Sequence, residues 1–209
     1  MRINQDTVLQ GKLVALVPYA LHHVPRYHEW MKSEMLQKLT ASEPLTLEQE
    51  YSMQHSWRED ADKCTFIVVD QKRWEEQACL DEDCMVGDVN LFLTAPEEPA
   101  LAEIEVMIAE PSNRGKGFGK EAALMMMFYG FTKLGIAKFE AKIGQENKAS
   151  ICMFQKLCFK EVSVSTVFQE VTMRLNMGEQ QKEWLLALTK HVTEAKYCET
   201  RQRIQQSMS

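Results

Sequence analysis

The sequence predicts an α/β protein whose central sheet is mixed, mostly antiparallel and flanked by helices. Three observations support this class: a meander of three strand-like runs, a glycine-rich turn that leads into a helix, and a closing pair of strands. Strands that follow one another directly pair antiparallel, whereas a strand–helix–strand unit brings its strands parallel. A doubly wound nucleotide-binding fold would alternate strand and helix throughout, and this order does not.

The first elements are a strand and two stretches of helix. Residues 12–17 alternate in hydrophobicity and are rich in β-branched side chains, which indicates a strand. Residues 21–39 carry apolar side chains at helical spacing, which suits one or two short helices. Thr46 and Gln49 have the spacing of a capping box, which opens a helix that runs to about residue 58.

The meander comes next. The apolar run 65–69 indicates a buried strand, and 85–93 and 101–109 indicate two more. The polar, acidic segment 71–83 is predicted as a long hairpin loop, and the acidic, proline-containing segment 94–100 as a second loop.

A glycine-rich turn occupies residues 114–120, after the third meander strand. It leads into a run of helix formers that begins at Glu121. Such a turn leaves backbone N–H groups unpaired at a helix N-terminus, where the helix dipole favours an anion, and glycine lets a phosphate approach the main chain. A Walker A loop needs Ser or Thr where Glu121 stands, and a dinucleotide fingerprint needs a longer final gap between glycines. The turn therefore predicts a phosphate site of neither common nucleotide class.

The run after the turn is apolar nearly all round, which predicts a buried helix that ends before Gly135. The remaining chain predicts, in order, a strand at 138–143, a helix at 149–157, paired strands at 161–167 and 170–177, a short helix at 183–189 and a frayed polar tail after His191. We therefore expect one domain over 1–177, followed by a C-terminal short helix and polar tail over 178–209.

Composition narrows the class of protein. The chain has 209 residues, enough for one sizeable core, and its net charge of −6 argues against nucleic acid as the main partner. The longest apolar run is about half of what a membrane span needs, so no membrane partner is expected. Six scattered cysteines without a C-x-x-C pair indicate free thiols in a reducing compartment. The histidines of the first helical stretch are expected to be ordinary polar residues, so no metal site is predicted.

Two motifs carry a resemblance to a known family. Arg114, Gly117 and Gly119 match R-x-x-G-x-G. A later segment matches N-x-x-[S/A]-I-x-x-[Y/F]-x-K-x-G-F at Asn147, Ser150, Ile151, Phe154, Lys156 and Phe159, with Cys158 at the usual glycine. In this order and at this separation, they resemble the GCN5-related N-acetyltransferase (GNAT) superfamily, over roughly residues 9–177. The resemblance implies a GNAT fold and acetyl-CoA as cosubstrate.

The resemblance also implies which residues hold acetyl-CoA. Its pyrophosphate would rest on the backbone of Gly115, Lys116, Gly117, Phe118, Gly119 and Lys120, beside Arg114. Its pantetheine arm would run along the end of the preceding strand, at Met107, Ile108 and Ala109, in a slot where the next strand diverges. Backbone N–H near Met107 or Ile108 would stabilise the oxyanion. Asn147 and Phe154 would line the far side of the arm.

Two carboxylates are the predicted catalytic residues. On a strand, Glu103, Glu105 and Met107 share one face, and two neighbouring carboxylates raise each other's pKa and attract a cationic amine. We favour Glu103 as base and Glu105 as substrate anchor; a solvated polar face is the equal alternative. Many family members have a Tyr at the position of Phe154 to protonate the CoA thiolate. Here the thiolate would leave unassisted, or Tyr129 would serve.

A eukaryotic subgroup of the family that acts on tubulin is similar at residues 27–31, 45–51 and 109–111. This similarity implies a protein N-terminal α-amine as acceptor, tubulin as partner, and a place in the cytoplasm in association with microtubules. Two alternatives stay open. One is a small-molecule amine acetyltransferase, which needs a closed acidic pocket covered by 22–40 and 71–83. The other is an acetyl-CoA-binding, microtubule-associated protein with little catalysis.

Overall fold

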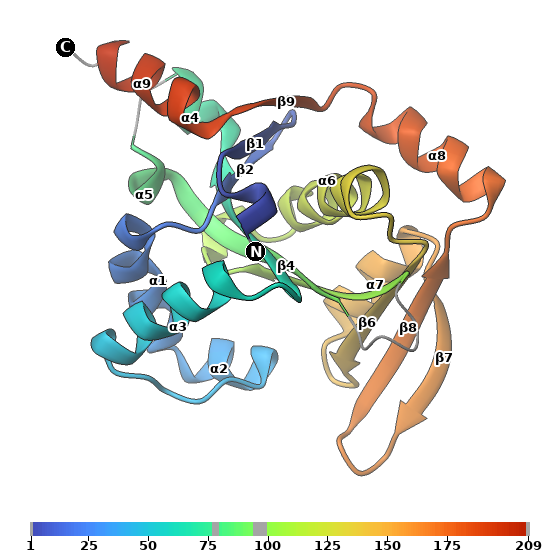
Figure 1. Cartoon of the computed structure of the whole chain (residues 1–209). Coiled ribbons are helices and arrows are strands. Elements are labelled where there is room, and N and C mark those ends of the chain that lie inside the picture. The colour runs from blue at the N-terminus through green and yellow to red at the C-terminus, as the bar shows by residue number, and fades with distance from the viewer. Residues whose placement is uncertain (1, 77–79, 94–99, 208–209) are drawn as a thin grey trace.

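The computed structural model describes residues 2–76, 80–93 and 100–207 (Figure 1). Its strands form one sheet in the order β7-β8-β6-β5-β4-β3-β2-β1-β9, and every neighbouring pair is antiparallel except β5–β6. The strands are β1 (Thr7–Gln10), β2 (Val14–Pro18), β3 (Lys63–Asp70), β4 (Met85–Leu93), β5 (Leu101–Ile108), β6 (Lys138–Gly144), β7 (Lys160–Ser165), β8 (Glu170–Asn176) and β9 (Thr193–Lys196). The predicted α/β class with a mixed, mostly antiparallel sheet is confirmed.

Helices cover both faces of the sheet. They are η1 (Arg2–Asn4), η2 (Leu21–His23), α1 (Val24–Met31), α2 (Glu34–Thr40), α3 (Leu47–Glu59), α4 (Gln71–Glu76), α5 (Asp81–Cys84), η3 (Pro111–Asn113), α6 (Phe118–Lys133), α7 (Lys148–Lys156), α8 (Glu179–Thr189) and α9 (Tyr197–Ser207). Buried side chains of α6, α7 and α8 build the core on one face, and those of α1, α2, α4 and α5 build the core on the other. Partly buried side chains of α3 and α9 pack against this second core. No helix in the described ranges is both long and apolar enough to cross a bilayer.

The structure confirms two local signals in the sequence, a helix cap and a helix stop. The capping box at the start of α3 is present, since the Gln49 N–H donates to Thr46 Oγ1 at 3.3 Å and the Thr46 N–H to Gln49 Oε1 at 2.8 Å. The predicted stop at Gly135 is confirmed, because this residue follows the last turn of α6 with φ of +70°, a conformation that favours glycine.

Three predictions are wrong. The strand β1 was missed, and the described parts of 71–83 are helical rather than a loop, because α4 and α5 form there and α4 is fixed by Trp74, which is fully buried. The tail after His191 is not frayed: β9 pairs with β1 through four residue pairs, and α9 continues from it. Residues 94–99, predicted as part of a loop, lie outside the described residues.

The sheet splits between β5 and β6. Their parallel ladder runs from Leu101–Lys138 to Glu103–Glu140 and ends there, while β5 stays paired with β4 and β6 with β8. The expected divergence is therefore present. It leaves the C-terminal half of β5 without a strand partner on the β6 side.

Candidate functional site

The glycine turn has the geometry of an anion cradle. Gly115 and Gly117 have φ of +71° and +93°, which side-chain-bearing residues rarely adopt, so glycine is strongly favoured at both. Glu121 N–H returns to the Gly117 carbonyl at 3.0 Å. The N–H groups just before Glu121 belong to the first turn of α6, where a helix has no intrahelical acceptors for its backbone donors. These free donors at the start of α6 fit a pyrophosphate.

The side chains of the glycine turn have different roles. Arg114 Nε donates to the Ile108 carbonyl and its second guanidinium nitrogen to the Ala109 carbonyl, both at 2.8 Å, so its side chain braces the end of β5. Phe118 is buried in the core, so its backbone is the part that can face a ligand. Lys116 and Lys120 are exposed beside the free N–H groups and can supply counter-charge.

Glu121 stands where a Walker A loop would have Ser or Thr. Its side chain has a structural role that the sequence did not predict. Its carboxylate accepts the backbone N–H groups of Lys12, Leu13 and Val14, at 3.0, 2.6 and 2.9 Å. It also lies 3.2 Å from His191 Nε2. Glu121 thus fixes the start of α6 to the turn before β2.

The second motif lies across the split on the α6 face. Asn147 caps α7 by accepting the Ser150 N–H at 3.1 Å, and Phe154 is buried edge-on against Phe159, with ring centroids 4.9 Å apart. A methyl group added at Gly119 would lie 3.4 Å from Ile108 and 3.5 Å from Met153 of α7. The glycine turn, the end of β5 and α7 therefore converge at one place.

The backbone conformation at Cys158 explains why the motif usually has glycine at this position. Its φ is +66°, directly after the C-terminus of α7, so the backbone needs the left-handed conformation at this position. The departure from the motif lies in the side chain and not in the fold.

A row of polar side chains crosses the opposite face of the sheet. Register places Thr65 beside Asn90 and Asn90 beside Glu105, on β3, β4 and β5. The Thr65 hydroxyl donates to Asn90 Oδ1 at 2.6 Å, and Asn90 Nδ2 donates to Asp88 at 2.7 Å. Burial raises the pKa of Asp88 to about 6, against the hydrogen bond from Asn90. Sequence reasoning missed this row, although polar residues that alternate inside a buried strand signal it.

The two predicted catalytic glutamates have different surroundings. Glu103 accepts a hydrogen bond from Lys142 Nζ at 2.7 Å, across the split. Protein around Glu105 desolvates its carboxyl and raises its pKa to about 7; Lys63 opposes this shift, and Glu103 adds to it. Glu105 nevertheless keeps an exposed surface, so water screens it more than a fully buried group and a substrate can reach it.

Neither Phe154 nor Tyr129 is placed to protonate a leaving CoA thiolate. Phe154 has no proton to give. Tyr129 is almost fully buried against Phe66, with ring centroids 5.3 Å apart, and shares a hydrogen bond with Thr7 of β1. It therefore lies among β1 and β3 and not at the split, so the alternative role for Tyr129 is wrong.

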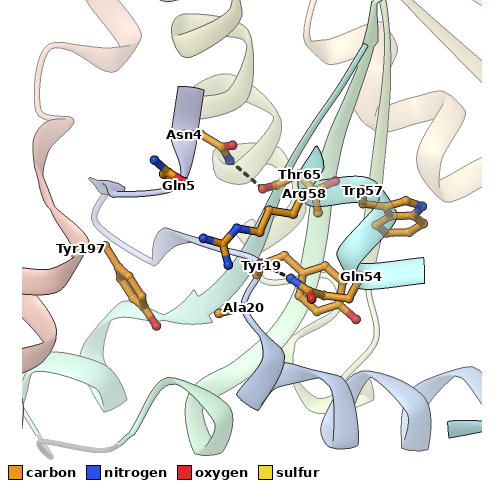
Figure 2. Close-up of a pocket in the computed structure, with 9 residues that line it drawn as sticks. All are labelled: Asn4, Gln5, Tyr19, Ala20, Gln54, Trp57, Arg58, Thr65 and Tyr197. Atoms are coloured by element: carbon orange, nitrogen blue, oxygen red, sulfur yellow. Dashed lines mark hydrogen bonds between the residues drawn. The ribbon is translucent and has the colours of Figure 1, made fainter. Parts of the chain in front are cut away.

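A cavity of about 230 Å³ lies beside the polar row (Figure 2). It touches that row at Thr65 and contains the side chain of Arg58 but no acidic residue. A cationic amine is poorly matched to such a lining. This cavity is therefore not the closed acidic pocket that a small-amine acetyltransferase would need.

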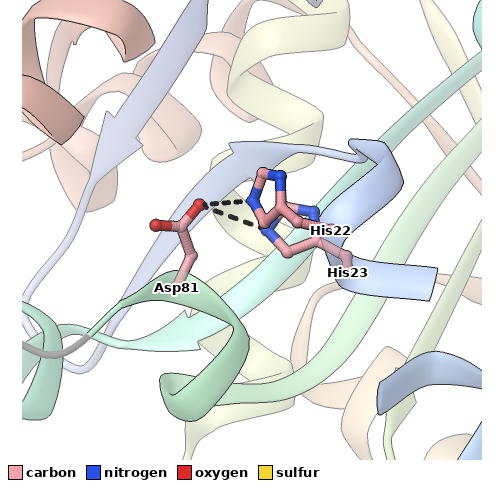
Figure 3. Close-up of side chains that lie close together, drawn as sticks. All are labelled: His22, His23 and Asp81. Atoms are coloured by element: carbon pink, nitrogen blue, oxygen red, sulfur yellow. Dashed lines mark hydrogen bonds and ion pairs between the residues drawn. The ribbon is translucent and has the colours of Figure 1, made fainter. Parts of the chain in front are cut away.

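The histidines of the first helical stretch meet Asp81 (Figure 3). The Nε2 atoms of His22 and His23 lie 3.1 and 3.2 Å from its carboxylate. His23 Nδ1 accepts the Ala20 N–H at 3.0 Å, so its proton lies on Nε2 and points at Asp81.

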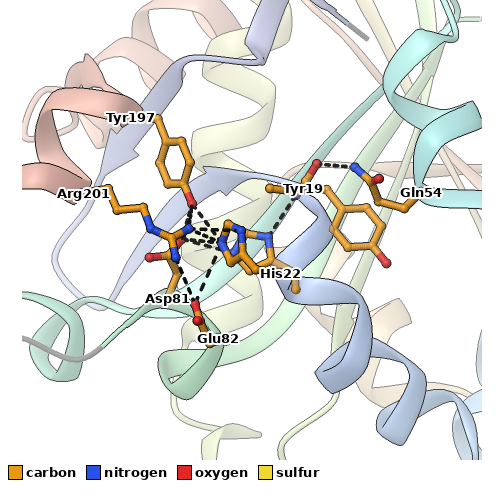
Figure 4. Close-up of polar contacts among 9 residues, drawn as sticks. Tyr19, His22, Gln54, Asp81, Glu82, Tyr197 and Arg201 are labelled. Atoms are coloured by element: carbon orange, nitrogen blue, oxygen red, sulfur yellow. Dashed lines mark hydrogen bonds and ion pairs between the residues drawn. The ribbon is translucent and has the colours of Figure 1, made fainter. Parts of the chain in front are cut away.

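Two residues of the C-terminal helix α9 complete the cluster of His22, His23 and Asp81. Tyr197 hydrogen-bonds to Asp81, and the Arg201 guanidinium lies 3.4 Å from the same carboxylate (Figure 4). A protonated imidazole nitrogen cannot ligate a metal, and a guanidinium already supplies positive charge. These contacts make the cluster an anchor for α9, and burial lowers the pKa of His23 to about 4.

Comparisons with known proteins agree with this arrangement. Residues 14–160 match the family model described as "Acetyltransferase (GNAT) domain". Human alpha/beta-tubulin-N-acetyltransferase 9 is 66% identical over 199 residues, which cover 94% of this chain and 96% of that protein. The Drosophila melanogaster protein of the same name is 47% identical, over 88% of this chain and 94% of its own length. The crystal structure of Vibrio cholerae spermidine N-acetyltransferase with CoA and spermine has a TM-score of 0.67 at 18% identity, over 80% of this chain and 97% of that one, a likeness of fold.

Proposed function

The chain belongs to the GNAT family of acetyltransferases, and from this premise we propose that it transfers the acetyl group of acetyl-CoA to a protein N-terminal α-amine, with tubulin as the partner. The observation that carries the proposal is Glu105. It is an accessible carboxylate with a raised pKa, on the strand where the sheet splits.

The residues fit the cosubstrate. The backbone N–H groups of 115–120 would hold the pyrophosphate, with Lys116 and Lys120 beside it. The pantetheine arm would lie between the end of β5 and α7, where Asn147 and Phe154 stand. Acetyl-CoA supplies an activated thioester, so the chain itself has only to orient the acceptor and move a proton. Arg114 contributes by bracing the carbonyls of Ile108 and Ala109.

Glu105 is the better general base of the two carboxylates. Glu103 already accepts a hydrogen bond from Lys142, whereas Glu105 is exposed and has a pKa near neutral pH. An α-amine has an ordinary pKa near 8, so a base of about 7 can take its proton with little free-energy cost. This assignment reverses the order that the sequence alone favoured: Glu105 is the base and Glu103 the anchor.

A protein acceptor suits the open side of the site. Glu105 is exposed, and the cavity that meets the polar row at Thr65 is lined by no carboxylate that could bind a free cationic amine. Two segments, 22–40 and 71–83, could have closed a small pocket. In the second of them, α4 and α5 pack on β2, β3 and η2. Two close relatives are named for tubulin, which supports tubulin as partner and a cytoplasmic, microtubule-associated location.

The test uses the purified chain, acetyl-CoA and three acceptors. These are a peptide with a free N-terminus and an internal lysine, the same peptide with its N-terminus blocked, and spermidine. We expect mass spectrometry to find the acetyl group on the α-amine of the free peptide. Acetylation of the internal lysine or of spermidine alone would contradict an N-terminal acceptor.

One observation favours a second function. Phe154 offers no proton to a leaving thiolate, so a chain that binds acetyl-CoA and contacts microtubules with little turnover is the alternative. Measurable acetyl-CoA binding with no transfer to any of the three acceptors would support that alternative.

A further inference from the structure

The cavity of about 230 Å³ contains one charged side chain. Of the described residues that line it, Arg58 at the end of α3 alone carries a formal charge. Figure 2 shows its guanidinium extending from α3 toward Tyr197. Within the described chain no carboxylate forms an ion pair with Arg58, and its neighbour Glu59 is bonded to Arg2 at 2.9 Å. The cavity therefore presents a guanidinium without an anion of its own.

Other polar groups of the lining are fixed by bonds within the protein. Asn4 Nδ2 donates to the Thr65 carbonyl at 2.8 Å, and Gln54 Nε2 donates to the Tyr19 carbonyl at 2.9 Å. Asn4, Gln54 and Thr65 are each at most 5% exposed, so the walls of the cavity are built from buried, bonded side chains. Arg58 is therefore the cationic donor that these walls leave open to a ligand.

Size and shape restrict the anion. Sites for drug-sized ligands enclose about 300–1,000 Å³, so a cavity of about 230 Å³ suits a smaller group. A guanidinium offers its N–H groups in a planar fork that matches a carboxylate in two parallel hydrogen bonds. The rings of Tyr19 and Trp57, with centroids 6.1 Å apart, add apolar area to the lining that can pack against a short aliphatic stem.

We propose that this cavity binds a carboxylate on a short aliphatic stem, with Arg58 as its counter-ion. The group would be the side chain of a glutamate or a free dicarboxylate. The acetyl transfer assigned to Glu105 does not use this cavity, so binding here can be measured without turnover.

Strand register gives the distance of the cavity from the proposed base. Thr65 lines the cavity and lies two strands away from Glu105, across Asn90. At about 4.8 Å per strand, the two backbones are about 10 Å apart, which an extended peptide spans in about three residues. One source of the carboxylate is therefore an acidic side chain near the third residue of the acceptor, and this source rests on the proposed function. The other source, a free dicarboxylate, does not.

The test measures binding without acetyl transfer. The parent chain is titrated with glutarate, with a hexapeptide that has glutamate at its second to fourth residues, and with the same peptide carrying glutamine there. The Nε–H signal of Arg58 in ¹⁵N NMR, identified by its absence in Arg58→Gln, reports contact, and calorimetry reports affinity. Arg58 is exposed, so Arg58→Gln should fold like the parent. Arg73→Gln, which removes an exposed arginine of α4 outside the cavity, is the matched control.

We expect the acidic peptide to bind at least roughly tenfold more tightly than the neutral one, and to shift the Arg58 signal, in the parent and in Arg73→Gln. Arg58→Gln should lose this preference. The net charge of −6 opposes non-specific attraction of an acidic peptide, so the preference would come from a local cation.

The remaining outcomes separate the two sources and the two proposals. A shift with glutarate but no preference between the peptides would support the free dicarboxylate as the ligand. An Arg58 signal that no probe moves, or a peptide preference that survives in Arg58→Gln, would overturn the inference. Failure of acetyl transfer in the parent would sink the proposed function and leave the binding results standing.

Discussion

Replacement of Glu105 by Gln tests the proposed base most directly. The pKa of Glu105 is raised to about 7 by desolvation, so about half of the carboxyls are ionised at pH 7 and only about 1% at pH 5. An ordinary glutamate would still be about 80% ionised at pH 5. The parent enzyme should therefore lose activity below pH 7 along a limb of slope one. In Glu105→Gln this limb should vanish, and kcat/KM at pH 7 should fall roughly 10²- to 10⁴-fold.

The assay is kcat/KM for an N-terminal peptide at saturating acetyl-CoA, from pH 5 to pH 9. The matched control is Glu103→Gln. The charge of Glu103 raises the pKa of Glu105, so its removal should move the acid limb to lower pH and leave the limb in place. The two isosteric changes are thus expected to act in different ways on one profile.

One result would refute this reasoning. If Glu105→Gln keeps a limb near pH 7 while Glu103→Gln loses it, then Glu103 is the base despite its bond to Lys142. If both variants keep the limb and the rate, neither carboxylate moves the proton, and the polar face is only solvated.

Three further predictions concern the turn, the motif and the C-terminal anchor. Gly119→Leu adds a bulky side chain where a methyl alone already meets Ile108 at 3.4 Å and Met153 at 3.5 Å, so acetyl-CoA binding should weaken at least roughly tenfold by calorimetry, with circular dichroism to check the fold. Equal binding would contradict the site. Cys158→Gly should raise the free energy of unfolding by about 1 kcal/mol, measured in urea, since φ of +66° strains a cysteine. Buried His23, with a pKa of about 4 against about 6.5 when unfolded, should cost up to about 3 kcal/mol of stability as pH falls from 6.5 to 4, because the unfolded chain binds the proton first. His23→Gln should remove that slope, and an unchanged slope would place its origin elsewhere.

Local rules were enough for much of this fold. The alternation of 12–17, the capping box at Thr46 and Gln49, and the left-handed stop at Gly135 each depend on a few neighbouring residues, and each is present. The glycine turn could be predicted for the same reason, since Gly115 and Gly117 have backbone conformations that other residues rarely adopt; its phosphate role stays a prediction.

The missed elements depend on distant partners. β9 has the composition of a polar linker and becomes a strand because β1, at the other end of the chain, offers it a free edge. α9 has few apolar side chains and is fixed largely by Tyr197 and Arg201 at Asp81, more than a hundred residues away in sequence. No periodic pattern within these segments encodes such contacts.

The candidate site shows the same division between local and distant information. The motifs predicted the cofactor side, and the period of a strand placed Glu103 and Glu105 on one face. The choice between them depends on Lys142, which lies on β6 and reaches Glu103 only in the folded sheet. This bond occupies Glu103 and leaves Glu105 as the proposed proton acceptor. In the proposed function, acetyl-CoA would approach the split between β5 and β6 from the α6 face and the acceptor from the α1 face, so that the base and the thioester would meet where the β5–β6 ladder ends.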